Sequence, residues 1–300
     1  MLYEEQFTLS VTLPFRLDYT VWALRRRQKN LIDKWDGKKY ARVFVIDGNA
    51  VQVTIEQKNE TKLAVTVRSE HKLPGIEKTI TNVLRRMLGI DKNLDGFYKL
   101  AGKDQYLKTL ASSFQGVKPP RFASIFEALI NAIACQQVTL DLGVLLLNRL
   151  AESYGKKFAD QHAFPRPEDL IDVPEDDLKS LGFSYQKSQA IISLAKSIIN
   201  REISFDNFED LPNEIIVTRL MEIKGIGRWS AEYMLLRGLG RIDTFPGDDV
   251  GAQKNLMLLM KLQEKPNYDE IKQVTKQWNP YAGFVYFHLL LDKLQKKNLL

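Results

Sequence analysis

The amino-acid sequence predicts an α+β fold, in which a small antiparallel β-sheet carrying helices is followed by a mostly α-helical part. Apolar and polar residues alternate in short runs near the N-terminus, which is typical of half-buried strands. From about Lys92 onward this alternation stops, and apolar residues recur at helical spacing between capped turns. We therefore expect a β-rich domain over residues 1–91 and an all-α domain over residues 92–300.

The predicted sheet rests on a few short segments. Residues 7–13 alternate between apolar and polar side chains. Residues 41–46 and 51–55 flank Asp47-Gly48-Asn49, a turn sequence typical of a β-hairpin, and residues 63–67 supply another strand. A sheet built from these segments would be antiparallel.

Two helical patterns accompany the strands, over residues 19–35 and residues 76–88. The first contains Arg25-Arg26-Arg27. A run of like charges usually forms a solvated helix face, and a phosphate contact is the alternative interpretation. Nothing in this part of the sequence suggests a catalytic residue.

Composition excludes several classes of protein. The single cysteine, Cys135, allows neither an internal disulfide nor a cysteine-ligated iron–sulfur cluster. The histidines His71, His162 and His288 match no zinc-binding spacing. No apolar run reaches the roughly 18 residues that a membrane helix needs, and no signal peptide is evident. A net charge of +6 is compatible with a polyanionic partner.

The most informative segment is 220–249, whose centre is Lys224-Gly225-Ile226-Gly227 between two helical patterns. Glycine permits a positive φ and leaves backbone N–H groups uncovered. The second pattern, residues 229–239, begins at this turn, so its free N–H groups and positive dipole end favour an anion such as a phosphate. Lys224 and Arg228 add positive charge. An ordinary corner between two helices is the alternative interpretation.

The longer sequence resembles a known family. It runs from Lys224 to Tyr233, then to Asp243 and to Pro246-Gly247-Asp248-Asp249, and it is similar to the helix-hairpin-helix (HhH-GPD) DNA glycosylases. The resemblance is strongest to their 3-methyladenine glycosylase II (AlkA-type) branch. It implies a mostly helical glycosylase fold, with the hairpin at about residues 216–240 and a catalytic loop at residues 243–250.

In this family the hairpin binds the DNA backbone and a downstream aspartate performs the chemistry, a position matched here by Asp249. A carboxylate beside the sugar can stabilise an oxocarbenium-like transition state and orient the attacking water. From the residues alone, an aspartate after Pro-Gly and before a helical pattern is also an ordinary N-cap. We assign the chemistry to Asp249 and a cap or supporting role to Asp248.

Two other segments carry the resemblance. The FEALINAIACQQVT segment at residues 126–139 is similar to the family's loop that enters the duplex, which implies DNA contacts by Gln136 and Gln137. The WNPYAGF segment at residues 278–284 is similar to a signature that places an aromatic residue in the base pocket. The resemblance thus implies a base pocket formed by Trp229, Tyr233 and Tyr281, and DNA contacts by Lys224, Gly225, Ile226, Gly227 and Arg228.

The reaction type depends on one position. Family members that also cut the strand use a lysine directly after the hairpin. Trp229 stands there in this sequence, so the resemblance implies a monofunctional enzyme that hydrolyses alkylated purines such as 3-methyladenine and 7-methylguanine from duplex DNA, the first step of base excision repair. An oxidised-purine glycosylase and a non-catalytic DNA-binding module are the alternatives.

The expected partner is damaged double-stranded DNA, reached by flipping the nucleotide out of the helix. We expect no organic cofactor, because neither a P-loop nor a dinucleotide-binding glycine motif is present. The family resemblance would place a Na⁺ or K⁺ ion at the backbone of Gly225 and Gly227. We expect a monomer in the cytoplasm, associated with the nucleoid, without a membrane partner.

Overall fold

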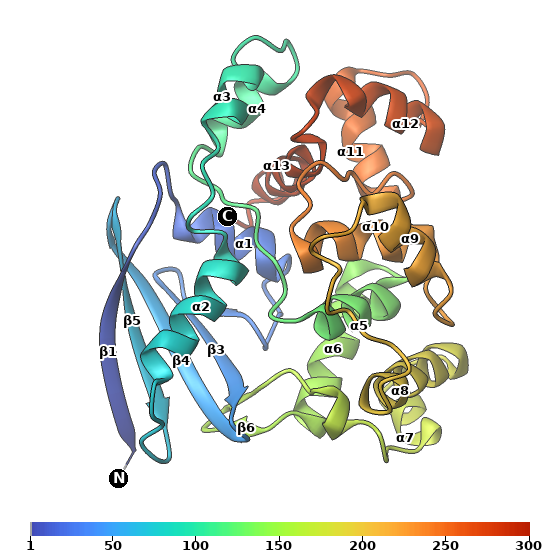
Figure 1. The fold of residues 1–300 in the computed structure, drawn as a ribbon. Helices are drawn as coiled ribbons and strands as arrows, with labels where there is room; N and C mark the ends of the chain where they lie inside the picture. The colour runs from blue at the N-terminus through green and yellow to red at the C-terminus, as the bar shows by residue number, and fades with distance from the viewer. Residues whose placement is uncertain (1) are drawn as a thin grey trace.

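The computed structural model describes residues 2–300, and its N-terminal part is a five-stranded antiparallel sheet (Figure 1). The strand order is β1-β5-β4-β3-β2. The strand signals in the sequence are confirmed, with slightly different ends. The strands are β1 (Tyr3–Ser10), β2 (Lys34–Trp35), β3 (Lys39–Ile46), β4 (Asn49–Asn59) and β5 (Lys62–Ser69).

Apolar and polar residues alternate along the strands, which gives the sheet one buried face. In β4, Val51, Val53 and Ile55 are buried, and Val53 lies opposite Val67 of β5. The turn between β3 and β4 has positive φ at both Asp47 and Gly48, as a two-residue hairpin turn requires. Helix α2 (Ile76–Leu88) lies across the sheet, and Ile76, Ile80 and Leu84 are buried.

The rest of the chain is mainly helical. Helix α1 (Leu17–Arg25) belongs to the N-terminal part but packs against the helical body (Figure 1). Within residues 2–300, no helix is both long enough and apolar enough to cross a bilayer. The helices of the body are α3 (Asp95–Ala101), α4 (Leu107–Ser113), α5 (Ile125–Cys135), α6 (Leu140–Tyr154), α7 (Glu175–Ser180), α8 (Tyr185–Ile199), α9 (Asn213–Met221), α10 (Arg228–Met234), α11 (Val250–Met260), α12 (Tyr268–Thr275) and α13 (Ala282–Gln295).

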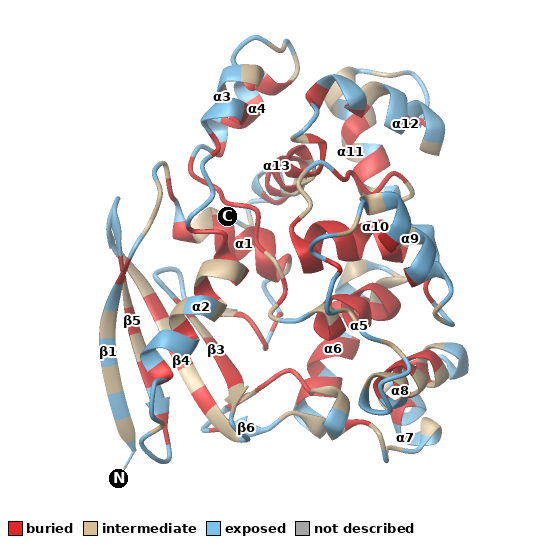
Figure 2. Ribbon diagram, in the orientation of Figure 1, coloured by how far each residue is buried: buried red, intermediate tan, exposed pale blue. Residues whose placement is uncertain are grey.

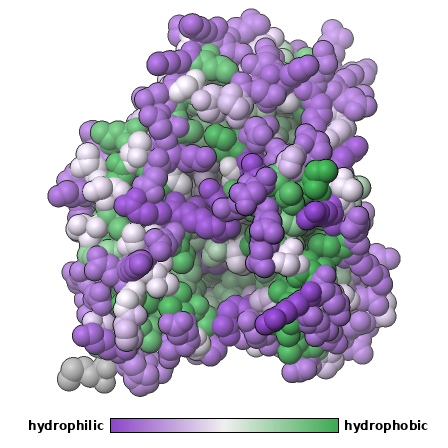
Figure 3. All heavy atoms as spheres, in the orientation of Figure 1, coloured by the Kyte–Doolittle hydropathy of each residue, from purple (hydrophilic) through white to green (hydrophobic). Residues whose placement is uncertain are grey.

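The apolar core is continuous from the sheet into the helical body. One cluster of buried side chains includes Val53 of the sheet, Ile80 of α2 and Leu129 of α5. A second cluster joins Trp22 of α1 to the helices near the C-terminus. Figure 2 shows buried residues concentrated where α1, α5, α10 and α13 meet. The face seen in Figure 3 is mainly hydrophilic, with apolar patches between the polar side chains.

Two predictions about local structure are wrong. The helical pattern at residues 19–35 ends at Arg25, because Arg26 adopts a left-handed conformation with φ of 61° that stops the helix. Strands also occur beyond Lys92, since β6 (Lys157–Phe158) pairs with β7 (Gln161–His162). Two residues per strand are too few to produce a visible alternation.

The three consecutive arginines do not form a solvated helix face. Arg25 and Arg26 are buried, with 4% and 5% of their surface exposed, and the side chain of Arg27 is 15% exposed. Arg25 donates to the carbonyl oxygens of Gln28 and Asp33, so its charge stabilises the loop that follows α1. Arg26 and Arg27 instead line a cavity in the helical body.

Candidate active site

Helices α9 and α10 form a hairpin around the Gly225-Ile226-Gly227 turn. Gly225 has a φ of +88°, and a Cβ there would come within 2.6 Å of the Ala190 Cβ, so the turn needs glycine. Ile226 is buried and anchors the turn in the core. Gly227 is exposed and is the N-cap residue of α10, and no side-chain hydrogen bond among residues 2–300 caps the free N–H groups at the start of that helix.

The loop that follows α5 is tied to this hairpin by Gln136. Its Nε2 donates to the Gly225 carbonyl oxygen and to the Ser230 hydroxyl, both at 2.8 Å. The ammonium of Lys187 donates to the carbonyl oxygens of Ala134 and Gln136, at the end of α5 where the helix leaves its last carbonyls without backbone partners. The next residue, Gln137, is exposed and has a φ of 53°. The structure therefore brings Gln136 to the hairpin and leaves Gln137 free.

Asp249 is both a helix cap and a residue of the site. Its Oδ1 accepts from the backbone N–H of Ala252 at 2.8 Å, which caps α11. Its Oδ2 accepts from the indole Nε1 of Trp229 at 3.2 Å and from the hydroxyl of Tyr286 at 3.1 Å. All three contacts are donated to the carboxylate, so the negatively charged form accepts all of them. The two interpretations of Asp249 are thus compatible.

Asp248 does not cap the helix, which corrects one of the two roles predicted for it. Its carboxylate binds the guanidinium of Arg228 through contacts of 2.7 and 3.0 Å. The same guanidinium lies 3.6 Å from the centre of the Tyr268 ring. Asp248 therefore holds Arg228 beside the start of α10.

Glu232 supports the loop before Asp249, a role that the sequence did not reveal. Its buried carboxylate accepts from the Gly247 N–H at 3.0 Å, from the Tyr268 hydroxyl at 2.7 Å and from Lys272 at 3.0 Å. A Cβ at Gly247 would come within 2.7 Å of the Tyr268 ring. The only signal in the sequence was a glutamate on an otherwise apolar helix face, which does not identify its partners.

A cavity of about 700 Å³ lies beside the hairpin and has Asp249 in its wall. The rings of Trp229 and Tyr233 stack in this wall, with centroids 5.3 Å apart. The loop after α5, the start of α11 and one face of α13 complete it. The lining also includes Cys135, Gln136, Gln137, Val138, Thr139, Leu140, Asp141, Asp248, Val250, Gly251, Ala252, Asn255, Leu289 and Leu290.

Tyr281 does not line this cavity, contrary to the base-pocket prediction. Its ring packs edge-on against Phe97, and its hydroxyl lies over Gly96. Tyr286 of α13 lines the cavity instead. Five positions along an α-helix turn a side chain by roughly 140° from its starting direction, so the two tyrosines face different surroundings. Burial, with the nearby Asp249 charge, raises the pKa of Tyr286 well above its usual value, so the hydroxyl keeps its proton.

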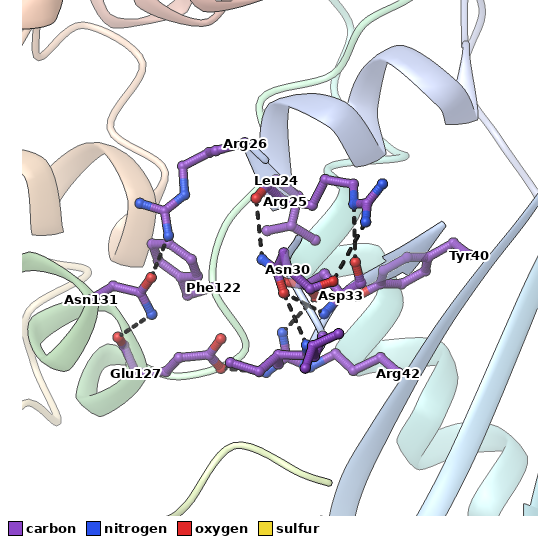
Figure 4. Close-up of polar contacts among 12 residues, drawn as sticks. Leu24, Arg25, Arg26, Asn30, Asp33, Tyr40, Arg42, Phe122, Glu127 and Asn131 are labelled. Carbon is purple, nitrogen blue, oxygen red and sulfur yellow. Dashed lines mark hydrogen bonds and ion pairs between the residues drawn. The ribbon is translucent and has the colours of Figure 1, made fainter. Parts of the chain in front are cut away.

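Three cations also line the cavity, and the sequence identified none of them as site residues. Arg26 donates to the Tyr233 hydroxyl at 2.8 Å and to Asn131 Oδ1 at 2.6 Å (Figure 4). Arg27 binds Asp141 at 3.1 Å. Lys293 lies on the same helix as Tyr286, and partial burial lowers the pKa of its ammonium. Their positions in the sequence give no sign that they converge.

The remaining predicted DNA contacts lie at the hairpin surface. Lys224 is exposed, and its ammonium binds Gln189 Oε1 at 2.7 Å. The predicted cation position involves two backbone carbonyls that already accept hydrogen bonds. The Gly225 carbonyl already accepts from Gln136, and the Gly227 carbonyl accepts from the Ala231 N–H at 3.0 Å. Each of these two oxygens uses one lone pair in this way and keeps a second lone pair.

Two family models match the chain. The model described as "HhH-GPD superfamily base excision DNA repair protein" matches residues 130–280, and the model of the AlkA N-terminal domain matches residues 6–124. A DNA-3-methyladenine glycosylase of Bacillus subtilis is 29% identical over 221 residues, which are 70% of this chain and 72% of that protein.

Solved structures show the same fold. The 3-methyladenine DNA glycosylase of Archaeoglobus fulgidus superimposes with a TM-score of 0.83 at 22% identity, over 95% of this chain and 97% of that chain. The 3-methyladenine DNA glycosylase of Schizosaccharomyces pombe, solved in complex with abasic DNA, gives a TM-score of 0.57 at 28% identity, over 65% of this chain and 94% of that chain.

Proposed function

The chain belongs to the HhH-GPD superfamily of base excision DNA repair proteins, and we propose that it is a monofunctional DNA glycosylase that hydrolyses alkylated purines from duplex DNA. The observation that most directly supports this function is that Asp249, hydrogen-bonded by Trp229 and Tyr286, lines a cavity next to the hairpin. The substrate class follows the names of the relatives, which are 3-methyladenine glycosylases.

DNA binding begins at the hairpin. The free N–H groups at the start of α10 and the cation Lys224 would hold phosphates of the damaged strand. Gln137, exposed next to the anchored Gln136, would enter the space that a flipped nucleotide leaves in the duplex. The hydrogen bonds of Gln136 to the hairpin fix the distance between these two contacts.

The flipped nucleotide would occupy the cavity. The stacked rings of Trp229 and Tyr233 provide an electron-rich surface that attracts a positively charged alkylated base. When the glycosidic bond breaks, its electron pair leaves with the base and positive charge develops on the sugar. Asp249 stabilises that charge and orients the water that adds to the anomeric carbon, giving an abasic site. The donors on Asp249 keep its carboxylate in place during this step.

The monofunctional assignment rests on Trp229, which has no amine and occupies the position directly after the hairpin. Lys293 lies in the cavity wall, and its amine is the group that could form a Schiff base with the abasic sugar and cut the strand. Covalent trapping with borohydride tests this directly, because a Schiff base between a lysine and the abasic sugar would be reduced to a stable adduct. We expect no adduct on alkylated, oxidised or abasic duplexes.

The decisive experiment compares base release from duplexes that contain 3-methyladenine, 7-methylguanine, hypoxanthine or 8-oxoguanine. We expect the alkylated purines to be released fastest and the strand to stay intact until alkali is added. Fastest release of 8-oxoguanine together with a borohydride adduct would instead identify the oxidised-purine enzyme. DNA binding without release of any base would identify a non-catalytic module. We further propose that the protein acts as a monomer on nucleoid DNA.

A further inference from the structure

Two buried arginines, Arg26 and Arg237, lie near Tyr233, and only Arg26 lines the cavity. Arg26 and Arg237 are 5% and 0% exposed, and neither forms an ion pair within residues 2–300. Arg237 donates to the carbonyl oxygens of Ala23 and Leu24, and its guanidinium carbon lies 6.0 Å from the centre of the Tyr233 ring. Burying a cation without an anionic partner costs free energy of folding, so stability alone does not account for these two buried arginines.

Arg26 is also incompletely hydrogen-bonded. Its two terminal nitrogens bind the Tyr233 hydroxyl and Asn131 Oδ1, but its buried Nε has no acceptor in the described chain. The amide of Asn131 in turn donates to the Glu127 carbonyl oxygen at 3.0 Å, which orients Asn131 toward Arg26. Figure 4 shows Arg26 turned toward Asn131 on α5 and away from Asp33 and Arg42, which form an ion pair at 2.8 Å. Arg26 therefore keeps one unused donor beside the cavity.

A hydrogen bond connects Arg26 to Tyr233 in the cavity wall. Its hydroxyl oxygen accepts from Arg26, and its proton is used by no hydrogen bond among residues 2–300. Burial raises the pKa of this hydroxyl, so the proton is present to be donated. Arg26 and Tyr233 both line the cavity, as does Asp249. The cavity therefore has an anion in one part of its wall and a hydrogen-bond donor backed by a cation in another.

We propose that Arg26 and Tyr233 form a leaving-group site that extends base release to neutral modified purines. A neutral purine takes the electron pair of the broken glycosidic bond and departs with developing negative charge. A donor backed by a fixed cation stabilises that charge in the transition state, and the departing base then takes up a proton equivalent to the one released by the attacking water. An N-alkylated cationic purine departs as a neutral base and gains nothing from this site. The inference rests on the proposed base release.

The test uses the 300-residue chain under single-turnover conditions, with duplexes containing one hypoxanthine, which is neutral, or one 7-methylguanine, which is cationic. We expect Arg26→Gln to slow hypoxanthine release by about 30-fold while 7-methylguanine release changes by less than about threefold. Arg26→Lys keeps the charge and should retain more hypoxanthine activity than Arg26→Gln. Arg16→Gln removes an exposed cation that is already bound to Asp18 outside the cavity, and it should leave the ratio of the two rates unchanged.

A second variant covers the case in which Arg26→Gln does not fold. Tyr233→Phe removes one oxygen atom and keeps the ring, and it should lower the hypoxanthine rate relative to the 7-methylguanine rate by about tenfold. The inference is overturned by an unchanged ratio in folded Tyr233→Phe, or by a wild-type protein that releases 7-methylguanine but no hypoxanthine. Release of neither base would instead refute the proposed function.

Discussion

The hydroxyl of Tyr286 donates a hydrogen bond of 3.1 Å to Oδ2 of Asp249, although the two residues are 37 positions apart. Helix α13 brings Tyr286 to the same carboxylate that caps α11. This contact joins the C-terminal helix to the loop after the hairpin. It is the relationship on which the proposed catalytic geometry most directly depends.

Replacing Asp249 by Asn should strongly reduce the rate of base release while preserving the fold. Asparagine is as good an N-cap as aspartate, so α11 should remain stable. The loss of negative charge facing the sugar should lower the single-turnover rate of 3-methyladenine release by about 100-fold or more. Fluorescence anisotropy on an uncleaved duplex should give an unchanged Kd. Full release activity in this variant would refute the catalytic role of Asp249.

Tyr286→Phe should reduce the rate less severely. One donor to Asp249 Oδ2 is lost, while the Trp229 indole still donates. We expect kcat for base release to fall about tenfold with little change in KM. Tyr281→Phe is the matched control, because Tyr281 lies against Phe97 outside the cavity and should have the wild-type rate. Equal effects of the two substitutions would contradict the assignment.

The two glycines of the hairpin should respond differently to alanine. Gly225→Ala forces a side chain into positive φ and into contact with Ala190, so it should cost about 2 kcal/mol of stability and also weaken DNA binding. At Gly227 an added Cβ would meet no atom within 4 Å, and the backbone has an ordinary φ of −97°. Gly227→Ala should therefore keep the wild-type Tm yet raise the Kd for DNA, because the added methyl group covers the phosphate site.

Gln136 and Gln137 offer a similar contrast. Gln136→Ala removes both hydrogen bonds to the hairpin and should lower Tm as well as DNA affinity. Gln137 is exposed and makes no such contact, so Gln137→Ala should leave Tm unchanged while weakening binding to a duplex that contains an abasic site. Thermal melts and anisotropy titrations on both variants separate the two roles. A lowered Tm for Gln137→Ala would argue against a free residue at that position.

Stability should fall as the pH decreases, because of His288. Burial lowers the pKa of this imidazole to about 4, and its Nδ1 donates to the Phe284 carbonyl oxygen at 3.0 Å. The unfolded chain binds the proton at a pKa of about 6.5. Above that value the imidazole is neutral in both the folded and the unfolded chain, so no stability is lost. As the pH falls from there toward 4, the proton binds mainly to the unfolded chain, and the free energy of unfolding decreases. Between about pH 7.5 and pH 5 the free energy of unfolding should fall by about 2 kcal/mol on this account.

His288→Leu provides the comparison for that measurement. Leucine fills similar space in the same apolar surroundings and does not titrate. Urea denaturation at both pH values should show a smaller loss of stability in the variant than in the wild type. An equal loss in both proteins would mean that other groups cause the pH dependence.

Local sequence signals predicted much of the fold. The Asp47-Gly48 hairpin and the helix at residues 76–88 are confirmed, because turn chemistry and apolar periodicity act over a few residues. The helix expected at residues 19–35 failed where the left-handed conformation of Arg26 stops it. That conformation leaves the guanidinium hydrogen-bonded to Asn131 and Tyr233, which are distant in the sequence.

The sequence by itself determined the alternation that makes the sheet, the glycine turn between two helices and the aspartate that begins the next helix. Each of these features depends on residues that are close together in the sequence, so their spacing and backbone preferences can be read from the sequence directly. Only the tertiary structure decided that Tyr286 rather than Tyr281 joins Asp249, and that Arg26 stands behind Tyr233. Those choices depend on how α1, α10 and α13 pack against one another, because the packing of distant helices decides which face of each helix meets the cavity.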